Sequence, residues 1–97
     1  MDSFEEIKLA LKENFELLSE KYKVRTIGVF GSCVRGERKG GSDVDILVEF
    51  DEVPGLFKFI ELEDYLAEIL GIKVDLVMKS ALKPAIGKHI LREVVYL

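Results

Sequence analysis

Four residue types are scarce in the sequence: its 97 residues include one cysteine, two prolines, one histidine and no tryptophan. The single cysteine, Cys33, excludes an internal disulfide and a zinc site built on cysteines, and it fits a reducing cytosol. No uncharged apolar run approaches the ~20 residues that a membrane-spanning helix needs. Residues 1–6 are acidic where a signal peptide is basic. These absences predict a cytoplasmic protein without a membrane segment.

An excess of positive charge is also missing. The chain has 14 Lys and Arg against 18 Asp and Glu, which gives a net charge of −4. Domains that bind DNA or RNA usually present a basic face, because their affinity rests on neutralising phosphates. Stable nucleic-acid binding is therefore disfavoured. The local balance differs only after the first predicted strand, where Arg35, Arg38 and Lys39 fall close together.

The chain does have enough apolar residues, 48% of the total, to build the core of a single domain over residues 1–97. Apolar residues at spacings of three and four predict helices, whereas β-branched and alternating segments predict strands. The expected elements are, in chain order, a helix over 3–22, strands over 24–30 and 43–50, a helix over 56–70, a strand over 72–78 and a helix over 82–92. Residues 33–37 leave room for a short helix, and residues 94–97 either continue the last helix or form an edge strand. This order predicts an α/β or α+β domain with a small mixed β-sheet flanked by helices.

Two of these elements carry a prediction about their buried face. In the strand over 43–50, alternation directs one set of side chains to the core: Val44, Ile46, Val48 and Phe50. In the helix over 56–70, the residues expected near one face are Leu56, Phe59, Ile60, Glu63, Leu66, Ile69 and Leu70, of which Glu63 is the polar exception.

Three aspartates and a Gly-Ser pair carry most of the chemical information. Gly31 and Ser32 end the first strand, Asp43 and Asp45 open the second, and Asp75 lies within the third. Two acids at this spacing share one face of a strand, where they repel each other unless a cation lies between them, and such a pair would naturally bridge two divalent cations. An acid in an apolar strand is costly unless it is paired or metal-bound. If the strands are neighbours, the three carboxylates should converge in a pocket that faces the Gly-Ser pair.

The residues around the Gly-Ser pair suit a phosphate ligand. Gly31 lets the backbone turn tightly and approach a ligand without a Cβ clash. Ser32 adds a hydroxyl, the following amides can point at phosphate oxygens, and Arg35 and Arg38 supply countercharge. Each feature taken singly is more often structural. Together with the acids, they favour a site for phosphoryl or nucleotidyl transfer.

Two reactive residue types are expected to stay outside this chemistry. His89, the only histidine, lies on the last predicted helix and is expected at the surface or in packing. Cys33 has no second cysteine and no histidine near it in sequence, so a nucleophilic role is not expected.

In this pattern the chain resembles the nucleotidyltransferase superfamily that includes the palm of DNA polymerase beta, and within it the minimal nucleotidyltransferase (MNT) group. The resemblance rests on four segments, residues 29–37, 42–48, 70–77 and 90–97. It implies that Asp43, Asp45 and Asp75 bind two Mg²⁺ ions and orient the triphosphate of ATP, and that Asp75 activates the acceptor hydroxyl. It also implies that Ser32, with Gly31, holds the terminal phosphates. Many members are antitoxins encoded beside a HEPN-domain ribonuclease toxin, which they silence by transferring AMP to a toxin tyrosine, by binding it, or both.

The first functional hypothesis is therefore an Mg²⁺-dependent nucleotidyltransferase that moves AMP from ATP to a hydroxyl of a partner HEPN toxin. The alternative is a non-catalytic antitoxin that neutralises its partner by occlusion. Transfer to a small molecule, such as an aminoglycoside, is a third reading, although related enzymes of that kind carry extra domains. Polymerase or tRNA-nucleotidyl activity fits the acidic charge less well. The sequence leaves open the acceptor, the base specificity and whether the chain forms a homo- or hetero-oligomer.

Overall fold

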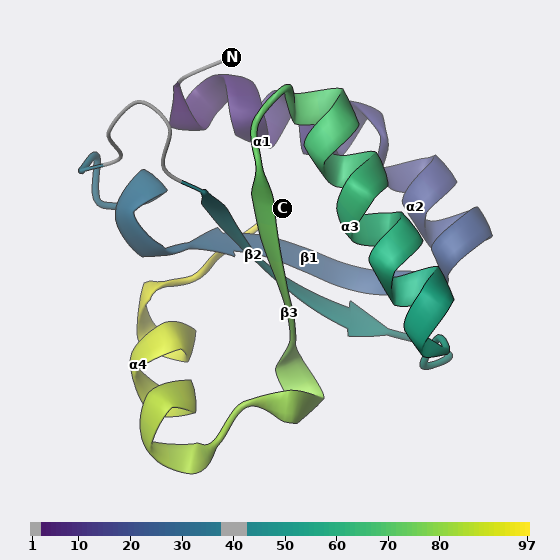
Figure 1. Ribbon diagram of the computed structural model, residues 1–97. Helices are drawn as coiled ribbons and strands as arrows, with labels where there is room; N and C mark the ends of the chain where they lie inside the picture. Colours follow the sequence, from purple (N-terminus) through teal and green to yellow (C-terminus); the bar gives the residue numbers. More distant parts are fainter. Residues whose placement is uncertain (1–2, 38–42) are drawn as a thin grey trace.

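A mixed sheet of four strands, in the order β3-β2-β1-β4, forms the centre of the molecule (Figure 1). The computed structural model describes residues 3–37 and 43–97. The elements, in chain order, are α1 (Phe4–Glu13), α2 (Phe15–Tyr22), β1 (Val24–Phe30), the 3-10 helix η1 (Gly31–Cys33), β2 (Val44–Phe50), α3 (Leu56–Leu70), β3 (Val74–Met78), the 3-10 helix η2 (Lys79–Ala81), α4 (Pro84–Glu93) and β4 (Val95–Tyr96). The predicted fold class, a mixed sheet flanked by helices, is confirmed.

The pairing of the strands follows from their connections. β1 runs antiparallel to β2, and β4 runs antiparallel to β1. β2 and β3 are parallel, and a parallel pair needs a long crossover, which α3 provides. Residues 94–97 thus do not extend α4, because Val95 and Tyr96 pair with β1 at the sheet edge. Gly28 permits this approach, since a Cβ there would come within 2.7 Å of Val94 Cγ2.

The first predicted helix is divided in two at Asn14. The Asn14 side-chain amide donates to the Ala10 carbonyl at 2.7 Å, and the Tyr65 hydroxyl donates to Asn14 Oδ1 at 3.3 Å. Asparagine competes in this way for helix carbonyls, so it interrupts a helix that the apolar spacing would continue. The prediction of one helix over 3–22 was therefore wrong at this residue.

The main core lies between the sheet and the three helices α1, α2 and α3 (Figure 1). The alternation predicted for β2 is confirmed, because its core set is buried: Val44, Ile46, Val48 and Phe50. The face predicted for α3 was partly wrong. Its buried residues are Leu62, Leu66 and Leu70, whereas Leu56 is 70% exposed and Ile60 is 43% exposed. At 100° per residue Ile60 lies about 120° round the helix from Leu66, so both residues cannot face the sheet.

The opposite face of the sheet is covered by α4 and holds a smaller core of Phe30, Leu47 and Ile90. Side chains alternate along a strand, so Asp45 projects to the same side as Leu47. This second face is therefore apolar under α4 and acidic at the start of β2. No helix within residues 3–37 and 43–97 is long and apolar enough to cross a membrane.

Candidate active site

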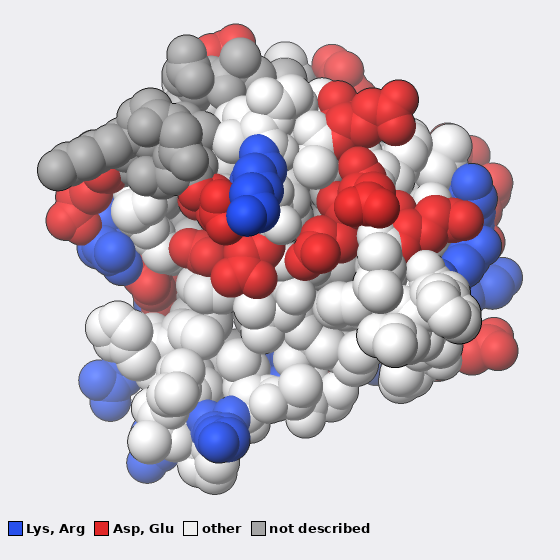
Figure 2. Space-filling view, viewed as in Figure 1, with Lys and Arg blue, Asp and Glu red and all other residues white. Residues whose placement is uncertain are grey.

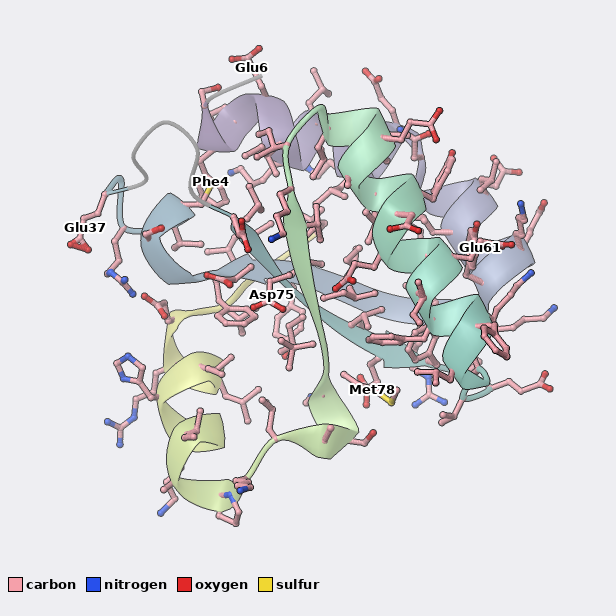
Figure 3. The ribbon with its side chains drawn as sticks, viewed as in Figure 1. Phe4, Glu6, Glu37, Glu61, Asp75 and Met78 are labelled. Atoms are coloured by element: carbon pink, nitrogen blue, oxygen red, sulfur yellow. The ribbon has the colours of Figure 1, made fainter. Side chains whose placement is uncertain are left out.

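The register of β2 against β3 brings two of the predicted acids side by side. Asp45 and Asp75 are direct partners in the parallel pair, and Asp43 lies immediately before β2. The Val44 amide donates to the Lys73 carbonyl at 2.9 Å, which fixes this end of the pair. Figure 3 shows Asp75 beside β3, and its side chain is exposed. The two strands thus supply carboxylates at one end of the sheet.

The electrostatics of Asp45 reflect the charged residues around it. The pKa of Asp45 is raised, first by burial of its carboxyl group and then by repulsion from Asp75, Asp43 and Glu93, while Arg35 partly offsets the rise. Asp45 is half-buried and Asp75 is exposed, so the pair combines a fixed carboxylate with one that a ligand can reach.

Gly31 packs directly against this acid group. Its φ of +81° lies in the left-handed region, and a Cβ there would overlap Asp45 Oδ2 and lie 3.1 Å from Asp45 Cγ. The residue must therefore be glycine for two reasons, one of backbone conformation and one of space. The turn at Gly31 and the Asp45 carboxylate are therefore in close contact.

The loop that follows is held by its own backbone. The Val34 amide donates to the Gly31 carbonyl at 3.1 Å, and the Glu37 amide donates to the Ser32 carbonyl at 2.8 Å. Cys33 is buried in the main core and fixes the loop to the sheet. The short helix spans Gly31–Cys33, not residues 33–37. Arg38 and Lys39, which the sequence also suggested, lie outside the described residues.

Arg35 projects from this loop and is ion-paired to two acids. Its Nε atom lies 2.5 Å from Glu37 Oε1, and its Nη1 atom pairs with Glu93 at the end of α4. The pKa of Arg35 is raised by the hydrogen bond to Glu37 and then by that to Glu93. An open depression of about 540 Å³ borders the pair and is lined by Arg35, His89, Arg92 and Glu93.

Glu93 is a member of this group that the sequence reasoning missed. It is separated from Arg35 by 58 residues, so no local spacing connects the two. The available signal was an acid in a C-terminal segment, residues 90–97, that is otherwise apolar apart from Arg92. His89 is exposed, as predicted.

The donor set fits Mg²⁺ in its chemistry. Mg²⁺ prefers hard oxygen ligands, and Asp43, Asp45 and Asp75 supply carboxylates whose mutual repulsion a cation would relieve. Within the described ranges, no three His, Cys, Asp or Glu side chains are gathered tightly enough to form a recognisable metal cluster. The backbone register and the chemistry of the donors are therefore what supports the predicted Mg²⁺ site.

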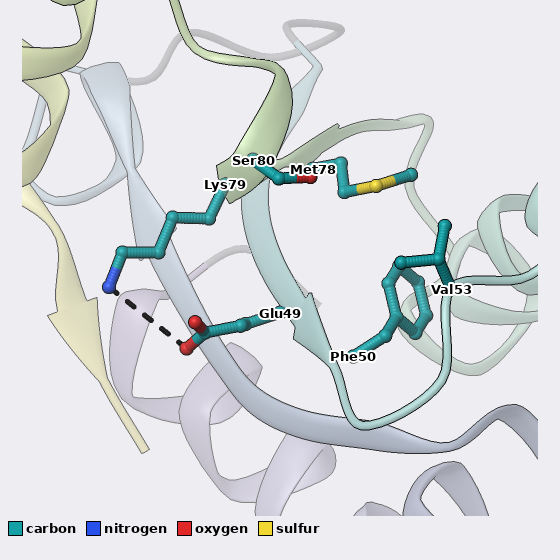
Figure 4. Close-up of a pocket in the computed structure, with 6 residues that line it drawn as sticks. All are labelled: Glu49, Phe50, Val53, Met78, Lys79 and Ser80. Atoms are coloured by element: carbon teal, nitrogen blue, oxygen red, sulfur yellow. Dashed lines mark ion pairs between the residues drawn. The ribbon is translucent and has the colours of Figure 1, made fainter.

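A separate cavity of about 340 Å³ lies at the other end of β2 and β3 (Figure 4). It is lined by Glu49, Phe50, Val53, Met78, Lys79 and Ser80, and Lys79 Nζ lies 4.0 Å from Glu49 Oε1. This acid is paired with a base. The cavity contains none of the predicted site residues.

Acidic side chains gather in a band across the face shown in Figure 2, over β3 and α3. Such a face repels a phosphate polymer.

Comparison with known proteins agrees with this geometry. A protein of Thermococcus cleftensis called protein adenylyltransferase MntA is 60% identical over 96 residues, which cover 99% of this chain and 97% of that protein. A solved structure provisionally described as a minimal nucleotidyltransferase superposes with a TM-score of 0.83 at 32% identity, covering 98% of this chain and 96% of the other. A toxin–antitoxin crystal structure with AMP-PNP superposes with a TM-score of 0.74 at 26% identity, covering 88% of this chain and 69% of the matched chain.

The sequence also matches the nucleotidyltransferase domain family over residues 11–97. This match includes the Gly-Ser turn and all three aspartates of the site. The resemblance and the enzyme class predicted from the sequence are confirmed: the chain belongs to the nucleotidyltransferase domain family.

Proposed function

We propose that this protein is an Mg²⁺-dependent enzyme that transfers AMP from ATP to a tyrosine hydroxyl of a HEPN-domain toxin, and that it acts as the cytoplasmic antitoxin of that toxin. The observation that carries the proposal is the pairing of Asp45 with Asp75 beside Gly31. The similarity to a protein adenylyltransferase and to a toxin–antitoxin complex with AMP-PNP supports the choice of nucleotide and partner.

In this proposal the three aspartates, Asp43, Asp45 and Asp75, would hold two Mg²⁺ ions. When bound, the ions neutralise the triphosphate and polarise the α-phosphate. Gly31 lets the backbone approach the nucleotide, and the Ser32 hydroxyl, together with Gly31, holds the terminal phosphates. The Arg35 guanidinium supplies positive charge beside the turn, where the negative charge of the leaving pyrophosphate develops.

The transfer forms one bond and breaks one. The acceptor oxygen attacks the α-phosphorus, the bond from that phosphorus to the oxygen bridging the α- and β-phosphates breaks, and pyrophosphate leaves. The proton of the acceptor hydroxyl passes to Asp75, which is the exposed member of the acid pair and can therefore meet an incoming side chain. Asp45, half-buried against Gly31, serves to hold charge and not to accept the proton.

A second candidate is neutralisation by occlusion without chemistry. Exposed apolar side chains on α4, Ile86 and Leu91, favour contact with a protein partner near the site. This reading predicts that the chain protects cells even when the aspartates are changed. No observation favours a small-molecule acceptor.

The test uses the purified protein, Mg²⁺, ATP labelled at the α-phosphate, and the HEPN protein encoded by the adjacent gene. Label should pass to the HEPN protein, and the double variant Asp43→Ala, Asp45→Ala should abolish the transfer. Asp64→Asn, an exposed acid on α3, is the matched control and should leave the transfer intact. Protection of cells by the double variant would favour occlusion. An absence of labelling by the wild-type protein would refute the enzymatic proposal.

A further inference from the structure

Arg35 is held by two carboxylates of very different exposure. The Glu37 side chain is 60% exposed, whereas the Glu93 side chain is only 14% exposed. Figure 3 shows Glu37 at the outer rim of the loop, directed away from the body of the molecule. One partner of Arg35 is therefore easily displaced, and the other is built into the fold.

The position of Glu93 is fixed on both sides along the chain. Ile90, on the preceding turn of α4, is buried, and the Val94 amide closes the helix by donating to the Ile90 carbonyl at 2.9 Å. Immediately afterwards, Val95 pairs with Val29 of β1. Glu93 thus projects from a junction of helix and strand, whereas Arg35 projects from a loop.

The ion pair lies next to the acid site. Glu93 and Arg35 both act electrostatically on Asp45, Glu93 by repulsion and Arg35 by attraction. The Arg35 amide donates to the Gly31 carbonyl at 3.4 Å, which places the base of the side chain at the Gly-Ser turn. The pair therefore lies between the end of α4 and the proposed phosphate site.

The chemistry of arginine suits this arrangement. A guanidinium has five N–H donors in a rigid plane, and the two carboxylates use Nε and Nη1, so donors remain for a phosphate. A long exposed side chain otherwise samples many rotamers and loses that freedom on binding. A partly buried acid that fixes the plane in advance reduces this cost.

We infer that Glu93 is a positioning residue that holds the Arg35 guanidinium toward the triphosphate, and that Glu37 is the contact that phosphate replaces. The inference rests on the proposed function, because it assumes a nucleotide at the Gly-Ser turn. It assigns Glu93 a role in binding ATP that acts through Arg35 and not through the aspartates.

The test is a double-mutant cycle of Glu93→Gln and Arg35→Gln, read by calorimetric titration with ATP and Mg²⁺ and by the KM and kcat of the transfer. Glu93→Gln should weaken ATP binding by about three- to tenfold, as expected for a partly buried ion pair, with the loss in KM and not in kcat. In the Arg35→Gln background, the same change should cost less than about twofold. Glu37→Gln, which removes the other carboxylate from Arg35, is the matched control and should not weaken binding.

Three results separate the possible failures. An equal loss from Glu93→Gln with and without Arg35 would overturn the inference, because Glu93 would then act on the aspartate site directly. Unchanged ATP binding in Glu93→Gln would overturn it as well. A wild-type protein that does not bind ATP would instead refute the proposed function.

If the melting curve shows that Glu93→Gln is unfolded, Glu93→Asp replaces it in the cycle. That variant keeps the charge on a shorter side chain, and its loss should likewise disappear when Arg35 is replaced.

Discussion

The two faces of β2 serve opposite purposes. On one face Val44, Ile46 and Val48 are buried beneath three helices, where apolar burial stabilises the fold. On the other face Asp45 lies against Asp75 and Gly31, where like charges repel and burial raises the pKa of Asp45. One strand thus combines a stabilising core face with a second face that is costly at its start, at Asp45. The difference indicates that the acidic face is maintained for chemistry and not for stability.

The largest expected effect comes from Asp45→Asn. It removes the carboxylate closest to Gly31, so AMP transfer should fall about a thousandfold. The free energy of unfolding should stay equal or rise, because the repulsion from Asp43 and Asp75 disappears. Transfer assays and urea unfolding of the same preparation measure both quantities. A marked loss of stability would show that Asp45 stabilises the fold, as the residues on the core face of β2 do.

Leu66→Ala should do the reverse of Asp45→Asn, because it should lower the stability of the fold. Leu66 of α3 is fully buried, and its truncation should lower the free energy of unfolding by about 3 kcal/mol. Leu56→Ala, the same change at an exposed position of the same helix, should cost less than about 0.5 kcal/mol. Urea denaturation gives both values. Equal losses would mean that α3 buries a different face from the one described.

Gly31→Ala tests the contact between the turn and the acids. Gly31 and Gly36 both have positive φ, but a Cβ at Gly36 meets nothing within 4 Å. Both alanine variants should lose about 1 kcal/mol of stability from the backbone alone. Only Gly31→Ala should displace Asp45, and a displacement of this kind lowers the transfer rate about a hundredfold. A comparable loss of rate in Gly36→Ala would indicate that loop strain, and not the Asp45 contact, controls activity.

The smallest effect concerns a buried group on the core side. Burial, followed by hydrogen bonding and repulsion from Glu61, raises the pKa of Tyr22 from 10.0 to about 12. Because the folded pKa exceeds the unfolded one, the contribution of Tyr22 is complete below pH 10.0 and is lost as pH rises toward about 12. Urea unfolding from pH 9 to about 10.5 should capture the onset of this loss in the wild type and less of it in Tyr22→Phe. Identical pH profiles would mean that Tyr22 is not buried in this way.

Local sequence patterns were sufficient for much of this architecture. The bounds of β1 and α3 match their predictions, because β-branched and apolar residues lie between clear turn and cap residues. The Asp-x-Asp spacing and the Gly-Ser pair were also visible, because each consists of neighbouring residues in the sequence. Their juxtaposition depends on the strand order, which local patterns do not determine.

The remaining features depend on contacts between distant segments. The break at Asn14 is supported by Tyr65 of α3, and the ion pair of Arg35 with Glu93 joins a loop to the last helix. The buried face of α3 depends on where the helix lies over the sheet. Apolar residues lie on more than one face of this helix, so their spacing did not determine which face is buried. Val95 and Tyr96 form an edge strand because Gly28 leaves space for this segment. None of these causes lies within a local window of sequence.

The most direct measurement is a crystal structure with Mg²⁺ and a non-hydrolysable ATP analogue. The account predicts that carboxylate oxygens of Asp43, Asp45 and Asp75 lie about 2.1 Å from the cations. It also predicts that the triphosphate contacts Gly31, Ser32 and Arg35. A nucleotide bound elsewhere, or an Asp75 carboxylate directed away from both cations, would contradict it.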